Sequence, residues 1–414
     1  MALLLIVSFV ATLLPIVLYT GALNIESIFE ISNLLDVDKR TGLWITILTI
    51  GIIGSIYAIY GGLRMVAYTD TINGYGLLVA GCLVPLIALY SIGDGNIIGG
   101  LVKVFNHAPE KFNVVSKEAS IGPGSRDAIL PFSVLFTGMI INQLYFWTMH
   151  QSIIQRVLGA VSLKEAQKGL LLTGVLKILI PIIIILPGII GFYYFGEQYY
   201  GESDLIYPVL VKKVLPFWLT GIFVAIVMGA VLSTFNSALN SAATIFSLGL
   251  YKRYWNKSVS DTGIVRVGRL VSLTLAVFAI GVAPFVANAP SGLYQLLQQL
   301  NGIFFIPMAT VILAAFLFPK VSAIGAKAGL VFGLLFYVIM NFVFKVEMHF
   351  VHLWGIEFIL NLVVMHMVSM VYPRENSFVM SDSGAVQLVP WKYTKFVSSV
   401  LIFITIVILS LIHI

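Results

Sequence analysis

The stretch from Gly229 to Ser241 concentrates small hydroxyl and amide side chains in the second half of a long apolar segment. Four side chains in and just after it recur at intervals that place them on one helical face: Ser233, Ser237, Asn240 and Thr244. Polar groups inside a bilayer face protein or water, and uncharged oxygens suit a hard monovalent ion that must bind and leave. The alternative is helix–helix contact, since small hydroxyl residues are common where membrane helices meet.

Lys177 lies inside a second apolar segment, between Val175 and Pro181. A lysine at such depth costs about 2.5–3.5 kcal/mol unless it is paired or hydrated. It either faces a polar ligand or extends its ammonium group to the nearer membrane surface, because Lys168 is only about three helical turns away.

Amides and aromatic rings cluster in two further segments. The first, Asn142 to Gln151, combines amides with Tyr, Phe and Trp rings, which could hydrogen-bond and stack on a sugar. The second, Tyr294 to Asn301, carries three glutamines and an asparagine at the start of an apolar run. Each has a packing alternative: an aromatic belt for the first, and amide bridges between helices for the second.

The composition defines the environment of these side chains. The 414 residues are 59% hydrophobic and 10% charged, with a mean hydropathy of +1.00, which is typical of a transmembrane bundle. The net charge is +6, and the basic residues lie in short loops. Their positions therefore indicate the orientation of the chain in the membrane and argue against nucleic acid as a partner. The single Cys82 excludes an intramolecular disulfide, and nucleotide-binding, zinc-protease and serine-hydrolase motifs are absent. No enzyme activity, organic cofactor or metal other than a transported ion is expected.

The apolar runs predict a protein of helices alone, with about eleven membrane spans: 2–30, 41–61, 66–92, 128–158, 165–196, 216–250, 265–288, 293–318, 324–345, 351–372 and 393–413. Short helices outside the spans are expected within 93–127 and from Asp204 to Lys213. A small-residue spacing in the ninth span predicts close contact with a neighbouring helix: Gly325, Gly329 and Gly333.

Lys and Arg residues gather in the even-numbered loops, which predicts that these loops are cytoplasmic. This orientation puts Met1 inside and Ile414 outside. The loop after the hydroxyl-rich span is the richest, and its basic residues extend into the next helix: Lys252, Arg253, Lys257, Arg266 and Arg269.

Three motifs together resemble the sodium/solute symporter family: Gly61 to Asp70, Gln151 to Gly169 and Ser237 to Lys252. Their order and spacing match from about residue 2 to residue 335, and the chain is most similar to the bacterial sodium/galactose (sodium/glucose) branch. The resemblance implies an all-α polytopic membrane protein with the LeuT-type fold. That fold has two inverted five-helix repeats, with substrate bound at mid-membrane between broken helices.

The resemblance also implies a domain organisation. Residues 1–414 are expected to form a single transmembrane transporter domain. Residues 1–92 would be the remainder of the first repeat, 128–318 the second repeat and 324–414 additional C-terminal helices. The match begins at the third core helix, so the chain resembles a family member that is N-terminally incomplete. Because the missing helices supply half of the family's sodium site and part of its sugar site, residues 1–414 alone are not expected to couple sodium to substrate.

For the coupling ion, Na+, the resemblance points to the hydroxyl-rich helix. The family's ligands on this helix fall on the backbone carbonyl of Ala230 and on the hydroxyls of Ser233 and Thr234. The family's acidic residue on the inward sodium path falls on Asp70. The alternative for Asp70 is an N-cap, since it lies near the start of the span over 66–92.

For the substrate, the family's sugar-facing lysine and glutamine fall on Lys177 and Gln298, with Gln295 one turn earlier. Two positions depart from the galactose pattern. The substrate asparagine is Gln143 here, and the inner-gate tyrosine is Phe146, with Tyr145 beside it. A ring without its hydroxyl can still stack on a sugar. The two departures leave a related sugar, a polyol or an acidic sugar open.

The expected function is sodium-coupled symport of a monosaccharide or related sugar, by alternating access, in the bacterial inner membrane. The expected partners are the solute, the sodium ion and the lipid bilayer. One alternative is a sugar acid, an amino acid or a vitamin as the solute, and Lys177 favours an acidic ligand. The other alternative is a non-transporting sensor on the same fold, which would be expected to carry a soluble output domain.

Overall fold

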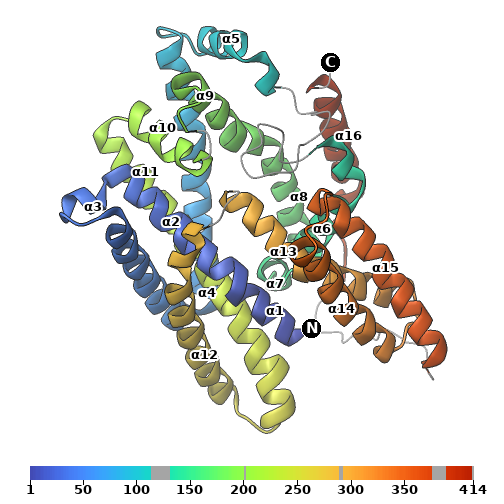
Figure 1. Cartoon of the computed structure of the whole chain (residues 1–414). Coiled ribbons are helices and arrows are strands. Elements are labelled where there is room, and N and C mark those ends of the chain that lie inside the picture. Colours follow the sequence, from blue (N-terminus) through green and yellow to red (C-terminus); the bar gives the residue numbers. More distant parts are fainter. Residues whose placement is uncertain (113–130, 200–201, 289–291, 375–387, 413–414) are drawn as a thin grey trace. The chain divides into compact units, whose positions relative to one another are not determined.

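The computed structural model describes residues 1–112, 131–199, 202–288, 292–374 and 388–412. These described residues form helices and no strands (Figure 1). Nine helical segments in them are long and apolar enough to cross a bilayer: Ala2–Phe29, Lys39–Gly61, Val66–Ile92, Leu163–Phe195, Phe217–Trp255, Asp261–Ala287, Leu293–Leu317, Ala323–Val343 and Phe350–Val371. The predicted all-α multi-pass architecture is therefore confirmed.

Two of the eleven predicted spans look different in the structure. The last, α16 (Thr394–Ile412), is a shorter apolar helix over Thr394–Ile408. The predicted span over 128–158 is broken into three pieces: η3 (Phe132–Phe136), α6 (Gly138–Thr148) and α7 (Gln151–Leu158). Such an interruption is consistent with the broken helices that the family resemblance implies.

The break between α6 and α7 has a local cause. The backbone N–H groups of Met149 and His150 both donate to the carbonyl of Tyr145, at 2.9 and 3.0 Å. This double use ends the regular ladder of α6. His150 then adopts extended backbone, and its carbonyl accepts the first bonds of α7.

The helices form two compact units. The N-terminal unit comprises Ala2–Val114, Gly174–Tyr294 and Val407–Ile414, and the C-terminal unit comprises Val115–Thr173 and Gln295–Ile406. The remaining elements that lie mostly in the N-terminal unit are α1 (Ala2–Ser8), η1 (Phe9–Leu13), α2 (Leu14–Phe29), α3 (Ile31–Leu34), α4 (Lys39–Ile92), α5 (Ile97–His107), η2 (Pro109–Phe112), η4 (Pro181–Ile185), α9 (Leu186–Phe195), η5 (Ser203–Leu205), α10 (Ile206–Val214), α11 (Phe217–Thr244), η6 (Ile245–Trp255), α12 (Asp261–Val282) and η7 (Ala283–Asn288). The C-terminal unit adds α14 (Ala323–Val338), η8 (Ile339–Val343) and α15 (Phe350–Val371), and α8 (Leu163–Ile180) and α13 (Leu293–Leu317) have residues in both units.

The long α4 is not a straight rod. In a straight helix, Tyr57 and Thr69 would lie about 18 Å apart along the axis. Their hydroxyl groups are nevertheless hydrogen-bonded to each other. The helix therefore bends sharply between them, and its two arms, Lys39–Gly61 and Val66–Ile92, correspond to the two spans predicted from hydropathy.

One apolar core joins both arms of α4 to α2, α11 and α12. Its fully buried side chains come from each of these elements, as well as from α9 and α10: Leu14, Leu18, Ile47, Ile50, Val84, Ile190, Leu210, Phe235, Leu239 and Ala276. This packing holds the hydroxyl-rich helix α11 directly against α4, because close van der Waals contact and interhelical hydrogen bonds join helices within a bilayer.

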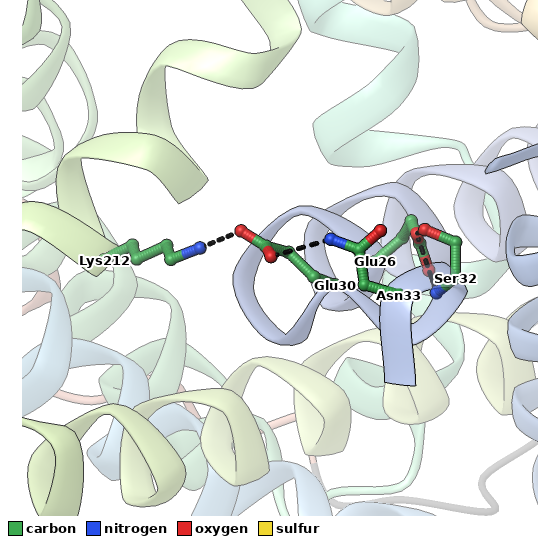
Figure 2. Close-up of polar contacts among 5 residues, drawn as sticks. All are labelled: Glu26, Glu30, Ser32, Asn33 and Lys212. Carbon is green, nitrogen blue, oxygen red and sulfur yellow. Dashed lines mark hydrogen bonds and ion pairs between the residues drawn. The ribbon is translucent and has the colours of Figure 1, made fainter. Parts of the chain in front are cut away.

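Polar contacts tie the turn between α2 and α3 to α10 (Figure 2). The backbone N–H of Ser32 donates to the Glu26 carboxylate at 3.1 Å, and the Ser32 hydroxyl donates to it as well. Glu30, in a left-handed conformation, turns the chain from α2 into α3. Its carboxylate accepts from Asn33 at 2.9 Å and from the ammonium group of Lys212 on α10. The predicted short helix over 204–213 is thus confirmed, and it is tied to the end of α2.

In the C-terminal unit, α14 and α15 lie side by side (Figure 1). The small-residue face of α14 makes this contact. Carbons added at Gly325, Gly329 and Gly333 would lie 2.2, 2.4 and 2.5 Å from Ser369, Met365 and Asn361 of α15. The predicted close helix contact is confirmed, because a side chain at any of these three glycines would overlap with α15.

Candidate sodium and substrate sites

The predicted sodium-binding face lies on α11, in the N-terminal unit, against the second arm of α4. The Ser233 hydroxyl donates a hydrogen bond to the Asp70 carboxylate, from a residue 163 positions away in the chain. Both side chains are half-buried. The fold therefore brings a predicted sodium ligand together with the predicted residue of the inward sodium path. Asp70 lies inside α4, four residues after the start of its second arm at Val66, so the N-cap alternative is wrong. Its role on the sodium path stays a prediction.

The other two predicted ligands are adjacent on α11. The Thr234 hydroxyl, which is exposed, donates to the Ala230 carbonyl at 3.0 Å. With the hydroxyl of Ser233, the preceding residue, this turn presents three neutral oxygens, and Asp70 adds a carboxylate. Such a set of oxygens is suited to a hard cation, although their role as ligands stays a prediction.

A fourth polar residue at this site was not predicted. Asn73, three residues after Asp70, donates its amide to the Gly229 carbonyl at 2.9 Å. A carbon added at Gly229 would lie 2.4 Å from the Asn73 side-chain oxygen, so glycine is required for this close approach. The contact holds the α11 backbone one residue before Ala230. The only signal in the sequence is the spacing of three from Asp70, which places both side chains on one helical face.

The rest of the hydroxyl-rich face divides into two parts. Ser237 and Ser241 are buried and donate to carbonyls of their own helix, at 2.7 and 2.6 Å. Such bonds suit the packing alternative, because they satisfy each hydroxyl within α11. Asn240 and Thr244, further along, line a pocket in the N-terminal unit.

Three of the predicted substrate residues lie on α6, and Gln143 is the exposed one among them. Its side-chain oxygen accepts from the Trp147 indole at 2.9 Å, and its amide nitrogen lies 3.7 Å from the sulfur of Met139. Both partners are one turn away on the same helix. The amide is therefore held in one orientation on the surface of α6.

Tyr145 and Phe146, although adjacent, have different surroundings. Tyr145 is fully buried, its hydroxyl donates to the Met308 sulfur at 3.6 Å, and its ring lies 4.8 Å from that of Phe305. Phe146 is half-buried and stacks on His150, with 5.4 Å between ring centroids. Phe146 therefore keeps a partly accessible ring beside the helix break, whereas Tyr145 packs in the core of its unit.

Gln295 and Gln298 lie on α13 in the same unit, the first half-buried and the second buried. Phe305, which contacts the rings of α6, follows Gln298 by seven residues, or about 10 Å along the helix. Lys177 is exposed on α8 and belongs to the N-terminal unit. The substrate roles of all these residues stay predictions.

A buried polar cluster in the C-terminal unit was also not predicted. Glu357, Asn361, Tyr337 and Trp354 are fully buried, and their polar side-chain atoms form no hydrogen bond of ordinary geometry with the described residues. They lie along the contact of α14 and α15, and a carbon added at Gly302 of α13 would lie 2.0 Å from the Trp354 nitrogen. A lone acidic residue in the predicted span 351–372 was the available signal.

The length and hydropathy of these helices indicate an integral multi-pass membrane protein. The family profile described as Sodium:solute symporter family matches residues 1–333. The chain therefore belongs to the sodium:solute symporter family, a family of transporters and not of enzymes, as the motifs led us to expect.

Two symporters are similar to the chain in sequence. It is 40% identical over 390 residues to the uncharacterized symporter YidK of Escherichia coli (strain K12), covering 94% of this chain and 66% of that protein. It is 29% identical over 343 residues to the sodium/glucose cotransporter of Vibrio parahaemolyticus, covering 79% of this chain and 60% of that protein. The chain thus spans less than two thirds of the length of these two relatives.

A similar solved structure is that of a Na+-coupled sialic acid symporter in a substrate-bound outward-open state. It shares the fold, with a TM-score of 0.71 over 90% of this chain and 75% of that chain, at 19% identity. The LeuT-type fold predicted from the motifs is thereby confirmed.

Proposed function

We propose that the whole protein is a sodium-coupled symporter of the bacterial inner membrane, and that its solute is a monosaccharide or a close relative. The observation that carries the proposal is the hydrogen bond from Ser233 to Asp70, beside the Ala230 carbonyl. It supports an ion site because it joins a predicted ligand to the acidic residue predicted on the ion's path.

In the proposed cycle, sodium replaces the hydrogen bond between Thr234 and Ala230 with contacts of its own to both oxygens. The hydrogen bond from Asn73 on α4 holds the carbonyl of Gly229, the residue before Ala230 on α11. The ion therefore binds a turn whose backbone is already positioned. The Asp70 carboxylate then binds the ion transiently on its path toward the cytoplasm. Inward movement of one sodium ion gains about 2.3 kcal/mol per 100 mV, which is available to drive solute uptake.

The sugar part of the proposal depends on amides and rings. Gln143 and Gln298 offer donors and acceptors to sugar hydroxyls, and Phe146 offers a ring that can stack on the sugar. The Vibrio relative, a sodium/glucose cotransporter, supports a hexose. The second candidate is an acidic sugar, favoured by the cationic Lys177 within a membrane helix.

The test is uptake by the whole protein in proteoliposomes, with labelled hexoses, sugar acids and amino acids, and with or without an inward sodium gradient. Sodium-dependent accumulation of one hexose is expected. Replacement of Lys177 by Gln should then lower hexose uptake only in part, because the amide keeps a hydrogen-bond donor for a neutral sugar hydroxyl. Accumulation of a sugar acid that Lys177→Gln abolishes would replace the hexose with the second candidate, and uptake that ignores the sodium gradient would refute the coupling.

A further inference from the structure

A pocket of about 260 Å³ lies within the N-terminal unit, away from the Ser233–Asp70 contact. Three helical segments form it: the end of the first arm of α4, the continuation of α11 into η6, and α12. A carbon added at Gly268 on α12 would reach only the Ser247 hydroxyl, at 3.9 Å, so this side of the pocket is open space.

Polar side chains on two sides of this pocket have hydrogen-bonding capacity to spare. They are Asn240 and Thr244 from α11, and Arg269 and Ser272 from α12. Within the described part of the chain, none of the four side chains forms a hydrogen bond or an ion pair. A guanidinium, an amide and two hydroxyls are together a set of donors that suits an anion, and a guanidinium can bind phosphate through two parallel hydrogen bonds.

The remaining lining of the pocket is apolar, contributed by Ile59, Leu248, Ile264 and Val265. A free inorganic anion gains nothing from such a surface. A molecule with a charged head and a hydrocarbon tail can use both surfaces at once, because burial of its apolar part adds to the polar contacts.

The charge of the surrounding sequence points to the same class of ligand. Between residues 250 and 272, Asp261 is the single acidic residue, whereas five residues are basic. Tyr251, Tyr254 and Trp255 lie at the end of η6, and such aromatic residues are enriched at the membrane–water interface. The basic loop is predicted to be cytoplasmic, and the anionic lipids of that leaflet attract such segments.

We propose that this pocket binds the phosphate of an anionic phospholipid. Arg269 holds the phosphate oxygens, Asn240 and Thr244 donate to the head group, and the start of an acyl chain follows Ile264 and Val265. The site is separate from the proposed sodium and solute sites, and it does not depend on the identity of the solute.

The test measures lipid retention by the purified full chain with native mass spectrometry, using phosphatidylglycerol and phosphatidylcholine as probes. Arg269→Gln removes the guanidinium, and Arg266→Gln is the matched control, because Arg266 lies one turn earlier on α12 and outside the lining. Phosphatidylglycerol should bind more tightly than phosphatidylcholine. Arg269→Gln should weaken phosphatidylglycerol binding about tenfold, as expected for the loss of a charged hydrogen-bond partner, whereas Arg266→Gln should change it little.

Thr244→Val is the second variant, because it keeps the shape of the side chain and removes only a donor. It should weaken phosphatidylglycerol binding by a smaller factor than Arg269→Gln. Equal losses in Arg266→Gln and Arg269→Gln would overturn the site in favour of general charge attraction. Displacement of phosphatidylglycerol by millimolar inorganic phosphate would overturn the lipid assignment in favour of a free anion, and equal binding of both lipids would overturn the requirement for negative charge.

Discussion

Replacement of Thr234 by Val removes one oxygen from the predicted sodium site while the branched shape of the side chain stays the same. Among the residues that the structure describes, the Thr234 hydroxyl bonds only to the Ala230 carbonyl of its own helix, at 3.0 Å, and the side chain is exposed. A bond of this kind adds little to helix stability, and substitutions at exposed sites usually stay within about 0.5 kcal/mol. The free energy of unfolding should therefore change very little.

Sodium affinity should change much more. A neutral oxygen that contacts an ion resembles a hydrogen bond to a charged group, which contributes about 1.5–3 kcal/mol. Since Thr234 is exposed, water can take over part of the lost contact, and the lower end of that range applies. The expected loss is therefore about 1.5 kcal/mol, or slightly more than tenfold in the sodium dissociation constant.

The assay is thermal unfolding of the purified whole protein, as in the uptake test, over a series of sodium concentrations, with choline replacing sodium to keep the ionic strength constant. A ligand that binds only the folded state raises the unfolding temperature as its concentration passes the dissociation constant. Thr234→Val should move this rise to about tenfold higher sodium and leave the sodium-free unfolding temperature unchanged. Thr234→Ser, which restores the hydroxyl, should return the sodium response to that of the unchanged protein.

The control variant is Ser237→Ala, one turn beyond Ser233 on the same face of α11. Its hydroxyl bonds to the Ser233 carbonyl at 2.7 Å and is assigned to packing. This change should lower stability by up to about 1 kcal/mol without shifting the sodium response. A sodium response that Thr234→Val leaves unchanged, or that Ser237→Ala weakens to the same extent, would refute the assignment of the ion to this turn.

Three further predictions concern other parts of the molecule. Gly302→Ala should destabilise the protein by about 1–3 kcal/mol in chemical denaturation, because the added carbon would lie 2.0 Å from the buried Trp354 nitrogen. The control, Gly169→Ala, should not destabilise the protein, because no atom lies within 4 Å of the added carbon. Phe146→Tyr should raise the preference for galactose over other hexoses in uptake competition, since it restores the hydroxyl of the galactose pattern. An unchanged preference would count against the inner-gate role of Phe146. Lys212 holds the pKa of Glu30 below its usual range, so their contact stabilises the fold at neutral pH and is lost as the pH falls through that lowered pKa. Lys212→Gln should therefore lower the unfolding temperature at pH 7 and make no difference at strongly acid pH.

Most of the fold could be predicted because membrane spans are a property of composition and length. Nine of the expected spans could be recognised from uninterrupted apolar runs alone. The break between α6 and α7 could not, since the residues from Tyr145 to Ile153 include no glycine or proline to signal it. It depends on backbone hydrogen bonds to a single carbonyl and on the extended conformation of His150, and neither leaves a trace in hydropathy.

The candidate sodium site divides in the same way. The spacing of hydroxyls along α11 could be read directly, because a helix repeats every 3.6 residues. Their partners could not be read from spacing, since Asp70 and Asn73 lie about 160 residues earlier in the chain. The family resemblance supplied Asp70. Asn73 became visible only when the two helices were seen in contact, with glycine at the point of closest approach.

Glu357 illustrates a signal that the sequence contained but periodicity could not interpret. One acidic residue in an apolar span of 22 residues could face lipid, water or protein. The free-energy cost of placing a carboxyl group differs among these three environments. The glycine spacing of α14 indicates the answer, because it predicts which face of that helix approaches its neighbour. Asn361 lies against Gly333 on this face, and Glu357 is one turn before it on α15. The same small residues that let the two helices pack closely therefore also keep this carboxyl group, with Asn361, Tyr337 and Trp354, fully inside the C-terminal unit and away from lipid.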